Sequence, residues 1–515
     1  MFYPFTNGFF CVKIRYIVKN RLLTVICLIY LLKGSFIMAN IRKPKIGIVS
    51  LGHKVYWPQF EGLYEELSQK SGEFAKYFKN AELFDAGFAD DVDSAFASVQ
   101  KLKKEDVDAL FIVLTTYVTS AVAAPFAIYL DVPQILVGIQ PLTHLDYKKT
   151  TTYMQLCNDD ICAMPEVAGV YERLGRKMPK FLVATSSETE KIAKKIETWE
   201  KALSAKAAFK YAKIGYLGHT YEGMYDMHTD PTAFSRTFGA HVKMLEMCEL
   251  REYVNGADDV KIKEKIEEIK RTFDIKEPSN DPLTDYVKDA DLEWSARCAV
   301  GLDELIERNG LTGLAYYYKG ENGNEYENIG ANLILGNTLL TSSGIPLAGE
   351  ADLKTCAAML VMNRVGGGGS FAELHPFDSD DDICLIGHDG PHNINISDKK
   401  PILRKLKKFH GKSGSGIGVE FNIKAGPISL LSCSVTSDGR MKMILGKGES
   451  ISGDIPQTGN TNTRCKFGCS VQDFIERWCS EGPTHHLALG TGDNTEAISL
   501  FCDIMNIELR KVALD

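Results

Sequence analysis

The chain has 515 residues, of which 44% are hydrophobic and 24% are charged, and its formal net charge is −8. This length exceeds that of a usual single domain, so we expect two or three domains, each with its own core. The charged residues form no basic stripe, which argues against nucleic acid as a partner. The 13 cysteines include no CxxC pair, so we expect reduced thiols rather than a zinc ribbon or a redox dithiol.

The first 37 residues differ from the rest of the chain. A basic segment, 13–21, precedes an apolar run, 22–32, which has the length of a signal-peptide core and is too short for a transmembrane helix. Either residues 1–37 are a signal peptide and the protein is exported, or translation starts at Met38, where MANIRKPKIGIVS leads directly into a strand. We favour the second interpretation, and with it a cytoplasmic protein without membrane association, because the unpaired cysteines suit a reducing cytosol and no small-residue cleavage site follows the apolar run.

Residues 38–212 are predicted to form a first Rossmann-like domain. Four apolar strands (KIGIVSL, AELFDAG, DALFIVLTT and PQILVGI) alternate with helical segments, one of them an amphipathic helix over 59–79. Repeated βα units of this kind predict a parallel, doubly wound sheet. Ligands of such sheets gather beyond the carboxyl ends of the strands, where the sequence places Tyr56 and Gln140. We take both as candidate substrate-binding residues, while loop packing is the plainer reason for polar residues in such places.

Residues 213–365 are predicted to form a second domain of the same class. KIGYLGH, which begins at Lys213, repeats the form of KIGIVSLGH in the first domain, and a long Lys-rich helix over 187–210 connects the two. Two further helices are expected over 258–271 and 289–309. Neither opening contains the GxGxxG pattern, which argues against a dinucleotide cofactor and an oxidoreductase.

After residue 365 the pattern changes to short β-type runs. GIGVEFNIK, GPISLLSCSV and RMKMILG are typical of strands, and TSDG supplies a hairpin turn between the last two. Residues 366–515 are therefore predicted to form a β-rich C-terminal domain with one helix, 471–479, inside it. The glycine run 366–369 follows a helix rather than a strand, so we expect a hinge or a close backbone approach there. The predicted fold class is α/β, with two Rossmann-like doubly wound lobes followed by this β-rich domain.

Carboxylates and imidazoles gather in the last third of the chain, each in a glycine-flanked setting. They are Glu350 in PLAGEADLK, Glu373 in GGGGSFAELHP, His388 in CLIGHDGPHN, and the pair His485–His486 in GPTHHLALGTGD. A mixed carboxylate and imidazole set suits Mn²⁺ or a similar divalent ion. Taken singly, these residues also have structural explanations: Glu350 could be a first-turn charge on a helix over 351–364, and His388 a satisfied histidine at a strand end.

The histidine doublet poses a choice of its own. Adjacent residues on a strand face opposite ways, so we expect only one of His485 and His486 to bind a given metal. His375 and His392 lie close to the other candidates in the sequence and could compete for a ligand role. The residues alone leave this choice open.

Four segments together, AGEADLKTCAAMLVMNRV, GGGGSFAEL, IGHDGPHN and GPTHHLALGTGD, resemble motifs of the L-arabinose isomerases and the related L-fucose isomerase-like proteins. The resemblance implies that the manganese ligands are Glu350, Glu373, His388 and His486. It further implies that His485 lies beside the substrate and that Met224 in YEGMYDM contacts it. It also implies a homo-oligomer, such as a hexamer, with its sites at subunit contacts.

The chain departs from this family at sugar-facing positions. AMPEVA at 163–168 stands where the family has His-Gly-Gly-Arg-Glu-Phe, and tyrosines and a lysine at 316–319 replace its phenylalanine strand end. LGHKVYWPQ keeps a His and a Tyr without the usual glutamine before the His. These changes leave the metal chemistry intact and put L-arabinose itself in question as the substrate.

The sequence therefore predicts a metal-dependent aldose–ketose isomerase that acts on an aldopentose or a deoxyhexose. One carboxylate, Glu350 or Glu373, would take the C2 proton to give an enediol, and the other would shuttle the hydroxyl proton. The ion would stabilise charge on the sugar oxygens. Two alternatives stay open: a metal-dependent sugar epimerase or aldolase with the same ligands, and a non-catalytic two-lobed sugar-binding protein, which would not need the metal set.

Overall fold

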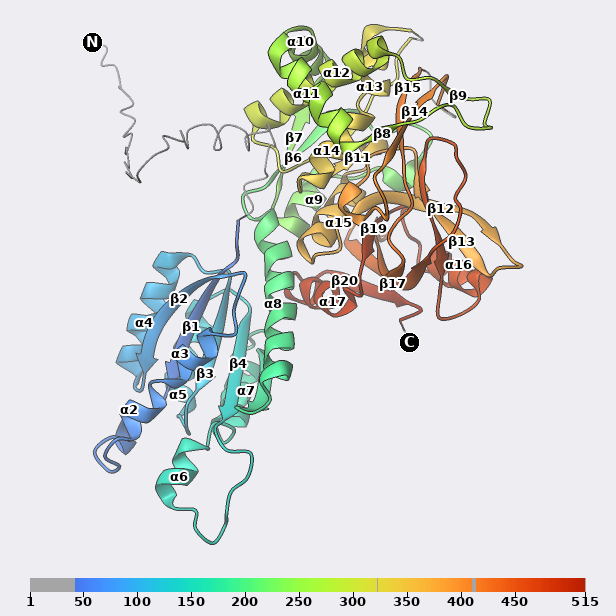
Figure 1. Cartoon of the computed structure of the whole chain (residues 1–515). Coiled ribbons are helices and arrows are strands. Elements are labelled where there is room, and N and C mark those ends of the chain that lie inside the picture. Colours follow the sequence, from blue (N-terminus) through green and yellow to red (C-terminus); the bar gives the residue numbers. More distant parts are fainter. Residues whose placement is uncertain (1–41, 322, 410–413, 515) are drawn as a thin grey trace, which may run out of the picture. The chain divides into compact units, whose positions relative to one another are not determined.

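The computed structural model of the protein describes residues 42–321, 323–409 and 414–514 (Figure 1). The predicted tail, residues 1–37, lies outside the described residues. Within the described part, no helix is long and apolar enough to cross a membrane. All eleven described cysteines are free, and seven of them are buried, as expected for reduced thiols. The fold class is α/β, as predicted: two parallel sheets with alternating helices precede a β-rich mixed sheet.

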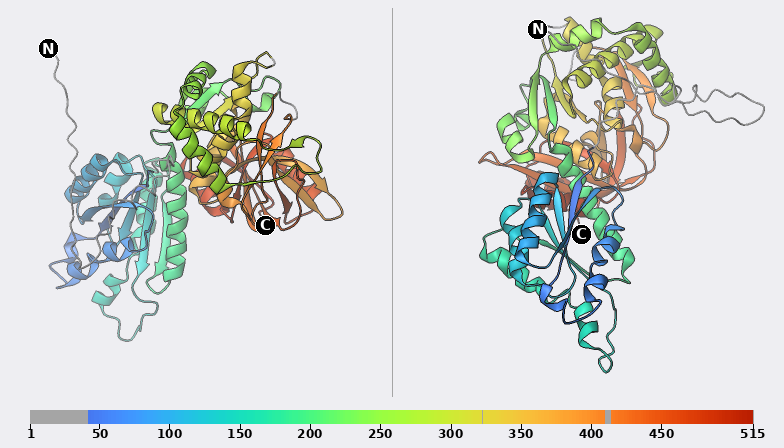
Figure 2. Two further views of the ribbon diagram at one scale, coloured as in Figure 1. Left: turned by 45° about the horizontal axis from the view of Figure 1, so that its top comes forward. Right: turned by 90° about the vertical axis from the view of Figure 1, so that its left-hand side faces the viewer.

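A five-stranded parallel sheet forms the core of the predicted first domain, with the strand order β2-β1-β3-β4-β5. Its strands are β1 (Lys45–Leu51), β2 (Glu82–Ala89), β3 (Ala109–Leu114), β4 (Gln134–Gln140) and β5 (Lys180–Thr185). The central strand β3 is buried along its whole length, because helices cover both faces of the sheet (Figure 2). One face packs against α4 (Val92–Glu105), α5 (Ser120–Tyr129) and α7 (Ala163–Arg173), and the other against α3 (Lys70–Ala75) and α8 (Thr189–Phe209).

The single helix predicted over 59–79 is instead two short helices, α2 (Leu63–Leu67) and α3. The leucines of α2 pack in a small cluster of their own, whereas Phe74 of α3 packs against the sheet. The helix is therefore broken because its two halves pack against different parts of the structure. At the break, Lys70 turns inward and forms an ion pair with the buried Asp160.

A four-stranded parallel sheet, ordered β11-β10-β6-β7, forms the core of the predicted second domain. Its strands are β6 (Lys213–Gly218), β7 (His241–Leu245), β10 (Gly313–Tyr317) and β11 (Leu347–Ala348). Helix α8 leads into β6, and the two predicted helices are present as α11 (Asp259–Thr272) and α12 (Asp289–Asn309). The remaining connections contain α10 (Met247–Asn255), α13 (Glu325–Ala331) and α14 (Ile334–Ser342).

A seven-stranded mixed sheet follows, ordered β16-β19-β12-β13-β18-β17-β20. A further β16–β17 pairing closes six of these strands into a ring, and β20 pairs with β17 outside it. Its strands are β12 (Ser370–Asp378), β13 (Ile383–His388), β16 (Gly426–Val435), β17 (Met441–Ile451), β18 (Thr461–Lys466), β19 (His486–Thr491) and β20 (Glu508–Val512). The TSDG segment joins β16 to β17, which confirms the predicted hairpin. The predicted helix is α16 (Val471–Ser480), and a second helix, α17 (Thr495–Ile504), was not predicted.

A small sheet crosses the predicted boundary at residue 365. Strands β8 (Asp274–Ile275) and β9 (Thr284–Asp285) pair with β14 (Ile402–Leu406), which also pairs with β15 (Gly416–Glu420). Segments on the two sides of the boundary are therefore tied together by backbone hydrogen bonds as well as by side-chain packing.

Helix α15 (Leu353–Arg364) connects the second sheet to the seven-stranded sheet and is buried over its first ten residues. It packs against α8 on one side and against β16 and β19 on the other. The glycine run that follows reverses the chain into β12. A Cβ at Gly369, whose φ is +75°, would lie 2.6 Å from the carbonyl oxygen of Met359, so the close backbone approach expected at this run is confirmed.

Candidate active site

Three neighbouring strands of the seven-stranded sheet carry Glu373, His388 and His486. The register pairs Glu373 on β12 with His486 on β19 and, on the other side, with Gly387, the residue before His388 on β13. One possible ligand atom from each of the three side chains lies within 4.8 Å of the others. Strand pairing therefore brings together residues that are up to 113 positions apart in the sequence.

Glu350 approaches the same histidine from the end of the second sheet. It lies in the short 3-10 helix η3 (Gly349–Ala351) and has a φ of +56°, and the next residue, Ala351, has a φ of +57°. Two successive non-glycine residues in this region cost about 1–2 kcal/mol each, which the surrounding packing must offset. The result is a buried carboxylate whose Oε2 lies 3.1 Å from Nε2 of His486.

Glu350 is not the first-turn charge that the sequence suggested. Helix α15 begins at Leu353, and Asp352 caps it by accepting hydrogen bonds from the backbone N–H groups of Lys354 (3.1 Å) and Thr355 (3.2 Å). The helix dipole and the cap therefore act on Asp352. The kink between Asp352 and the 3-10 helix leaves the Glu350 side chain directed to the cluster.

Asp352 is a component that the sequence analysis did not single out. Its side chain is fully buried, and its Oδ2 accepts a hydrogen bond from the Thr355 hydroxyl (2.7 Å) and lies 3.3 Å from Nδ1 of His486. The ammonium group of Lys354, also fully buried, lies 3.5 Å from Oδ1. Burial disfavours the charge, but Lys354 and His486 hold the pKa of Asp352 well below its usual range. The signal in the sequence was an Asp immediately before a helix, in GEADLK.

Glu373 and His486 both have pKa values far from their ordinary ones. Burial lowers the pKa of His486, but its contacts with Asp352 and Glu350 outweigh that effect and raise the pKa to about 9. Burial raises the pKa of Glu373, but the hydrogen bond with His375 and the nearby charge of His388 lower it to about 2. The carboxylates around His486 stabilise a positive charge, and the imidazoles around Glu373 stabilise its ionised form.

His485 belongs to the site through a different contact. Asp226 Oδ2 accepts a hydrogen bond from its backbone N–H (2.9 Å) and lies 2.7 Å from its Nδ1. Strand β19 begins only at His486, so the alternation expected for adjacent strand residues does not apply. The rings of His485 and His486 lie side by side, with centroids 3.9 Å apart, and the expectation that they face opposite ways was wrong.

Met224 lies on the loop that carries Asp226, half-buried at the start of the 3-10 helix η2 (Tyr225–Met227). Lys354 holds this loop in place, because its ammonium group donates to the carbonyl oxygen of Met227 (2.8 Å) and to the hydroxyl of Thr229 (3.0 Å). The predicted substrate-side methionine is thus tied to the cluster through the same lysine that balances Asp352.

The two competing histidines have other partners. His375 lies between Glu373 Oε1 (3.2 Å from its Nε2) and Asn462 Oδ1 (2.6 Å from its Nδ1). His392 is 1% exposed, and its Nδ1 lies 3.3 Å from the hydroxyl of Ser370. Among the described residues, the groups whose atoms could meet at one ion are Glu373–His388–His486 and Glu350–His485–His486.

These donors fit a divalent cation. Both groups combine carboxylate oxygens with imidazole nitrogens and share His486, and the side chains are buried or half-buried. Such a set suits Mn²⁺ or a similar divalent ion. Phe371 packs against the rings of both His388 and His486, with centroid distances of 4.7 and 4.4 Å, and so restricts how these imidazoles can turn.

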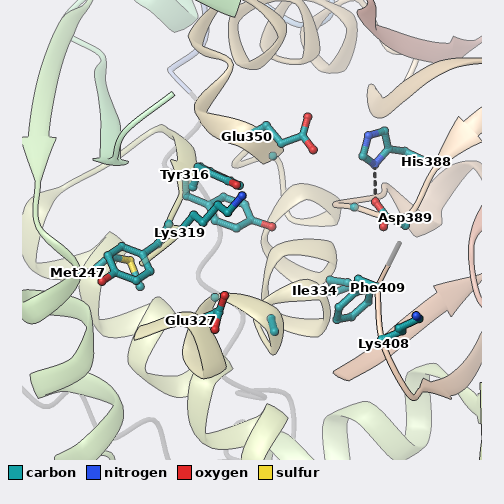
Figure 3. Close-up of a pocket in the computed structure, with 16 residues that line it drawn as sticks. Met247, Tyr316, Lys319, Glu327, Ile334, Glu350, His388, Asp389, Lys408 and Phe409 are labelled. Atoms are coloured by element: carbon teal, nitrogen blue, oxygen red, sulfur yellow. Dashed lines mark ion pairs between the residues drawn. The ribbon is translucent and has the colours of Figure 1, made fainter. Parts of the chain in front are cut away.

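A cavity of about 480 Å³ borders the cluster at Glu350 and His388 (Figure 3). Its wall includes three consecutive tyrosines, 316–318, and Lys319, together with Glu327 and Phe409. The volume lies in the range of small-molecule sites, and the mixture of aromatic surface with a few polar groups is typical of them. The arrangement can hold a small polar ligand with one end against the carboxylates.

Two predicted substrate-binding residues, Tyr56 and Gln140, do not line this cavity. Both lie at the carboxyl edge of the first sheet, as the sequence indicated. The Tyr56 ring contacts the ring of His53 (4.9 Å between centroids), and the Gln140 side-chain amide donates to the carbonyl oxygen of Leu142 (2.6 Å). Within one copy of the chain, the structure therefore joins Glu350, Glu373, His388 and His486 with His485 and the Met224 loop, but not with the first sheet.

Comparison with known proteins gives matches over the two later segments. Residues 221–368 match the family model of the L-arabinose isomerase central domain, and residues 368–508 match that of the L-arabinose isomerase C-terminal domain. The chain is 21% identical over 343 residues to L-arabinose isomerase 1 of Bacillus licheniformis, which covers 65% of this chain and 66% of that protein. It is 21% identical over 358 residues to the L-arabinose isomerase of an Arthrobacter species, covering 67% of each.

A shorter match is to an isomerase that is named for another sugar. The chain is 23% identical over 172 residues to the sulfoquinovose isomerase of Priestia aryabhattai, which covers 33% of this chain and 38% of that protein. The matched part of the chain thus spans about two thirds of the length of the arabinose isomerases and less of the sulfoquinovose enzyme.

Proposed function

With its central and C-terminal domains the chain belongs to the L-arabinose isomerase family, and we propose that it is a metal-dependent aldose–ketose isomerase. The observation that carries this proposal is a cluster in which His486 links Glu350 with Glu373 and His388, and of which Glu350 and His388 line a cavity of about 480 Å³. A cavity of this size accepts a small sugar. Carboxylates beside it can move a proton between adjacent carbons.

The proposed ligands of the divalent ion are Glu350, Glu373, His388 and His486. Mn²⁺ is the first candidate, because carboxylate oxygen together with imidazole nitrogen suits it. When bound, such an ion stabilises the negative charge that develops on two adjacent sugar oxygens. Support for the set comes from the 3.1 Å between Glu350 Oε2 and His486 Nε2. His486 also belongs to both possible ligand groups, one with Glu350 and His485 and the other with Glu373 and His388.

The two carboxylates divide the proton transfers in this proposal. One of Glu350 and Glu373 takes the proton from C2 of the aldose, the C–H electron pair becomes the C1=C2 bond of the enediol, and the carbonyl oxygen O1 gains a proton. The same carboxylate then returns its proton to C1 while O2 loses its proton and becomes the ketose carbonyl. The other carboxylate carries the hydroxyl proton between O2 and O1. Burial raises the pKa of Glu373, but the hydrogen bond with His375 and the nearby charge of His388 lower it to about 2, so this carboxylate is ionised at neutral pH.

The substrate in this proposal is an aldopentose or a deoxyhexose. The relatives are named for L-arabinose and for sulfoquinovose, and both are free aldoses of this size. His485 and Met224 would contact the sugar from the loop that Lys354 anchors. Tyr56 and Gln140 would reach a sugar only from a second copy of the chain, so we propose a homo-oligomer, such as a hexamer, in which the first sheet of one copy covers the cavity of another.

The test is sugar turnover by the protein started at Met38, stripped of metal and resupplied with Mn²⁺. The panel is L-arabinose, L-fucose, D-arabinose, D-galactose, D-xylose and 6-deoxy-6-sulfo-D-glucose. We expect ketose from at least one sugar, only in the presence of metal, and exchange of the C2 proton with solvent. Turnover that is equally fast in chelator-treated protein, or an epimer or cleavage product in place of a ketose, contradicts the proposal.

A matched pair of variants tests the carboxylate. Glu350→Gln keeps the size of the side chain and removes its basicity, so kcat should fall at least about 100-fold, the usual contribution of a positioned general base. Glu222→Gln changes an exposed carboxylate on the neighbouring loop and serves as the control. A Glu350→Gln protein with full activity would show that another group moves the proton.

A further inference from the structure

Lys319 stands in the wall of the cavity that borders the carboxylate and imidazole cluster. It follows β10, two residues after the strand ends at Tyr317, and ligands of parallel sheets gather beyond such strand ends. Its side chain points toward the interior of the cavity, on the side away from His388 (Figure 3). A cation therefore faces the space that a sugar would occupy, away from the proposed reacting carbons.

The acidic groups that line the same cavity have other partners. Glu350 lies against His486, Asp389 Oδ1 lies 3.0 Å from Nδ1 of His388, and the Glu327 carboxylate accepts a hydrogen bond from the backbone N–H of Gly323 (2.7 Å). Within the described part of the chain, Lys319 forms no ion pair or hydrogen bond. Lys408 adds a second ammonium group to the lining.

An aromatic contact links Lys319 to the site. Its Nζ lies 5.8 Å from the centroid of the Tyr221 ring, a distance at which a ring face attracts a cation. The backbone N–H of Tyr221 in turn donates to the carbonyl oxygen of Glu350 (3.4 Å). Tyr221 therefore contacts the ammonium group of Lys319 through its ring and the backbone of Glu350 through its N–H group.

We propose that Lys319 binds an acidic substituent, a sulfonate, phosphate or carboxylate, on the end of the sugar remote from C1 and C2. This inference rests on the proposed function and narrows its substrate class. A sugar that fills the cavity displaces water from the ammonium group of Lys319. An oxyanion on that sugar replaces the lost water contacts with charge-assisted hydrogen bonds. A neutral aldose offers only hydroxyl groups in exchange, so it should bind less tightly.

The experiment measures binding, so that it does not depend on turnover. The Mn²⁺-loaded protein is titrated calorimetrically with neutral and acidic members of two sugar series. The glucose series is D-glucose, 6-deoxy-6-sulfo-D-glucose, D-glucose 6-phosphate and D-glucuronate. The galactose series is D-galactose, D-galactose 6-phosphate and D-galacturonate. At least one acidic sugar should bind about tenfold more tightly than its neutral parent, the gain expected from one charged hydrogen bond at a partly open site.

Three variants test whether Lys319 causes the tighter binding of the acidic sugar. Lys319→Gln should abolish the advantage of the acidic sugar, Lys319→Arg should retain most of it, and Lys399→Gln, an exposed lysine outside the cavity, should leave it unchanged. Raising the salt concentration should weaken binding of the acidic sugar and spare the neutral one. The acidic member that binds best identifies the substituent.

Three results overturn the proposal: equal affinity for acidic and neutral members, no binding of any acidic sugar, or an advantage that survives Lys319→Gln. A change in the mass of the oligomer on Lys319→Gln, measured by light scattering, with sugar discrimination intact would show that the lysine pairs with a neighbouring copy instead. Failure of the proposed isomerase function would give a different result from failure of the Lys319 proposal. In that case no sugar, whatever its charge, would yield ketose in a metal-dependent reaction.

Discussion

His486 lies between two carboxylates. Asp352 Oδ2 is 3.3 Å from its Nδ1, and Glu350 Oε2 is 3.1 Å from its Nε2 on the opposite side of the ring. Because its pKa is raised to about 9, this imidazole carries a proton on each nitrogen at neutral pH. A carboxylate that accepts the Nδ1–H keeps that proton in place, so an ion that displaces the other proton would meet the lone pair of Nε2. The buried ammonium group of Lys354 balances the charge of Asp352. The cluster is therefore supported by an interior ion pair that also anchors the Met224 loop.

Asp352→Asn should weaken metal binding without removing a proposed ligand. Asparagine can still cap α15, but it no longer attracts the Nδ1–H as strongly and leaves Lys354 without its counter-charge. We expect metal affinity to fall about 10–100-fold, the usual effect of losing such a partner, measured by competition with a chromophoric chelator. Asp258→Asn is the control, because Asp258 caps α11 through the same two backbone contacts and lies on another element. Equal metal affinity in wild type and Asp352→Asn would refute the role.

Gly387→Ala should disrupt the strand pair that positions His388. A Cβ at Gly387 would overlap the carbonyl oxygen of Thr461, which belongs to the backbone of β18 and cannot move aside cheaply. We expect the free energy of unfolding to fall by about 1–3 kcal/mol or more, measured by denaturant titration. Gly169→Ala on α7 meets nothing within 4 Å and should stabilise the protein by up to about 1 kcal/mol. If both variants unfolded like wild type, the β13–β18 contact would be looser than described.

The cluster could be predicted in part because its members stand in short motifs with unusual composition. His388 is at the end of a strand that the sequence located, and pairing with β12, a strand that the sequence did not indicate, brings Glu373 beside it. The contact between Asp226 and His485 could not be predicted, because the two residues are 259 positions apart and meet only through tertiary packing. Asp352 carried a local signal as a helix cap, but nothing in the sequence shows that its second oxygen faces an imidazole.

His392 should make the protein less stable in acid. Burial is the main cause that lowers its pKa from 6.5 to about 3, so the folded protein keeps this imidazole neutral while the unfolded chain protonates it. The unfolded state thus binds more protons between these values, and stability is lost as the pH falls below 6.5. His392→Gln removes this contribution, worth about 2–3 kcal/mol over two pH units.

The measurement is the melting temperature of wild type and His392→Gln from pH 8 down to about pH 4.5, the range over which the linkage acts. Wild type should lose more stability than the variant on acidification. His241→Gln, a change at an exposed histidine, should leave the wild-type profile unchanged. Parallel profiles for wild type and His392→Gln would show that the imidazole titrates freely in the folded protein.

Much of the fold follows from local patterns, and the exceptions have identifiable physical causes. The parallel sheets, α8, α11, α12 and the TSDG hairpin agree with periodicity and turn chemistry. The helix predicted over 59–79 is broken because α2 and α3 pack against different partners. The pairing of β8 and β9 with β14 joins segments that are more than 100 residues apart, and strands of two residues leave almost no pattern to read.

His388 and His375 both lie near Glu373, and a variant of each should show which of the two is a metal ligand. His388 Nε2 is 4.0 Å from Glu373 Oε1, farther than the 3.2 Å of His375 Nε2. Yet among the described residues only His388 meets both Glu373 and His486 in a possible ion site, and His375 has a second partner in Asn462. Binding of an ion to the folded state at 100 times its Kd stabilises that state by about 2.7 kcal/mol.

His388→Ala should therefore lose most of the Mn²⁺-induced rise in melting temperature, whereas His375→Ala should keep most of it. The measurement is differential scanning calorimetry of each protein with excess Mn²⁺ and with chelator, so that each variant serves as its own reference for folding. Each difference then reports binding rather than the loss of packing. The reverse order, with His375→Ala losing the metal effect and His388→Ala retaining it, would replace His388 by His375 in the ligand set.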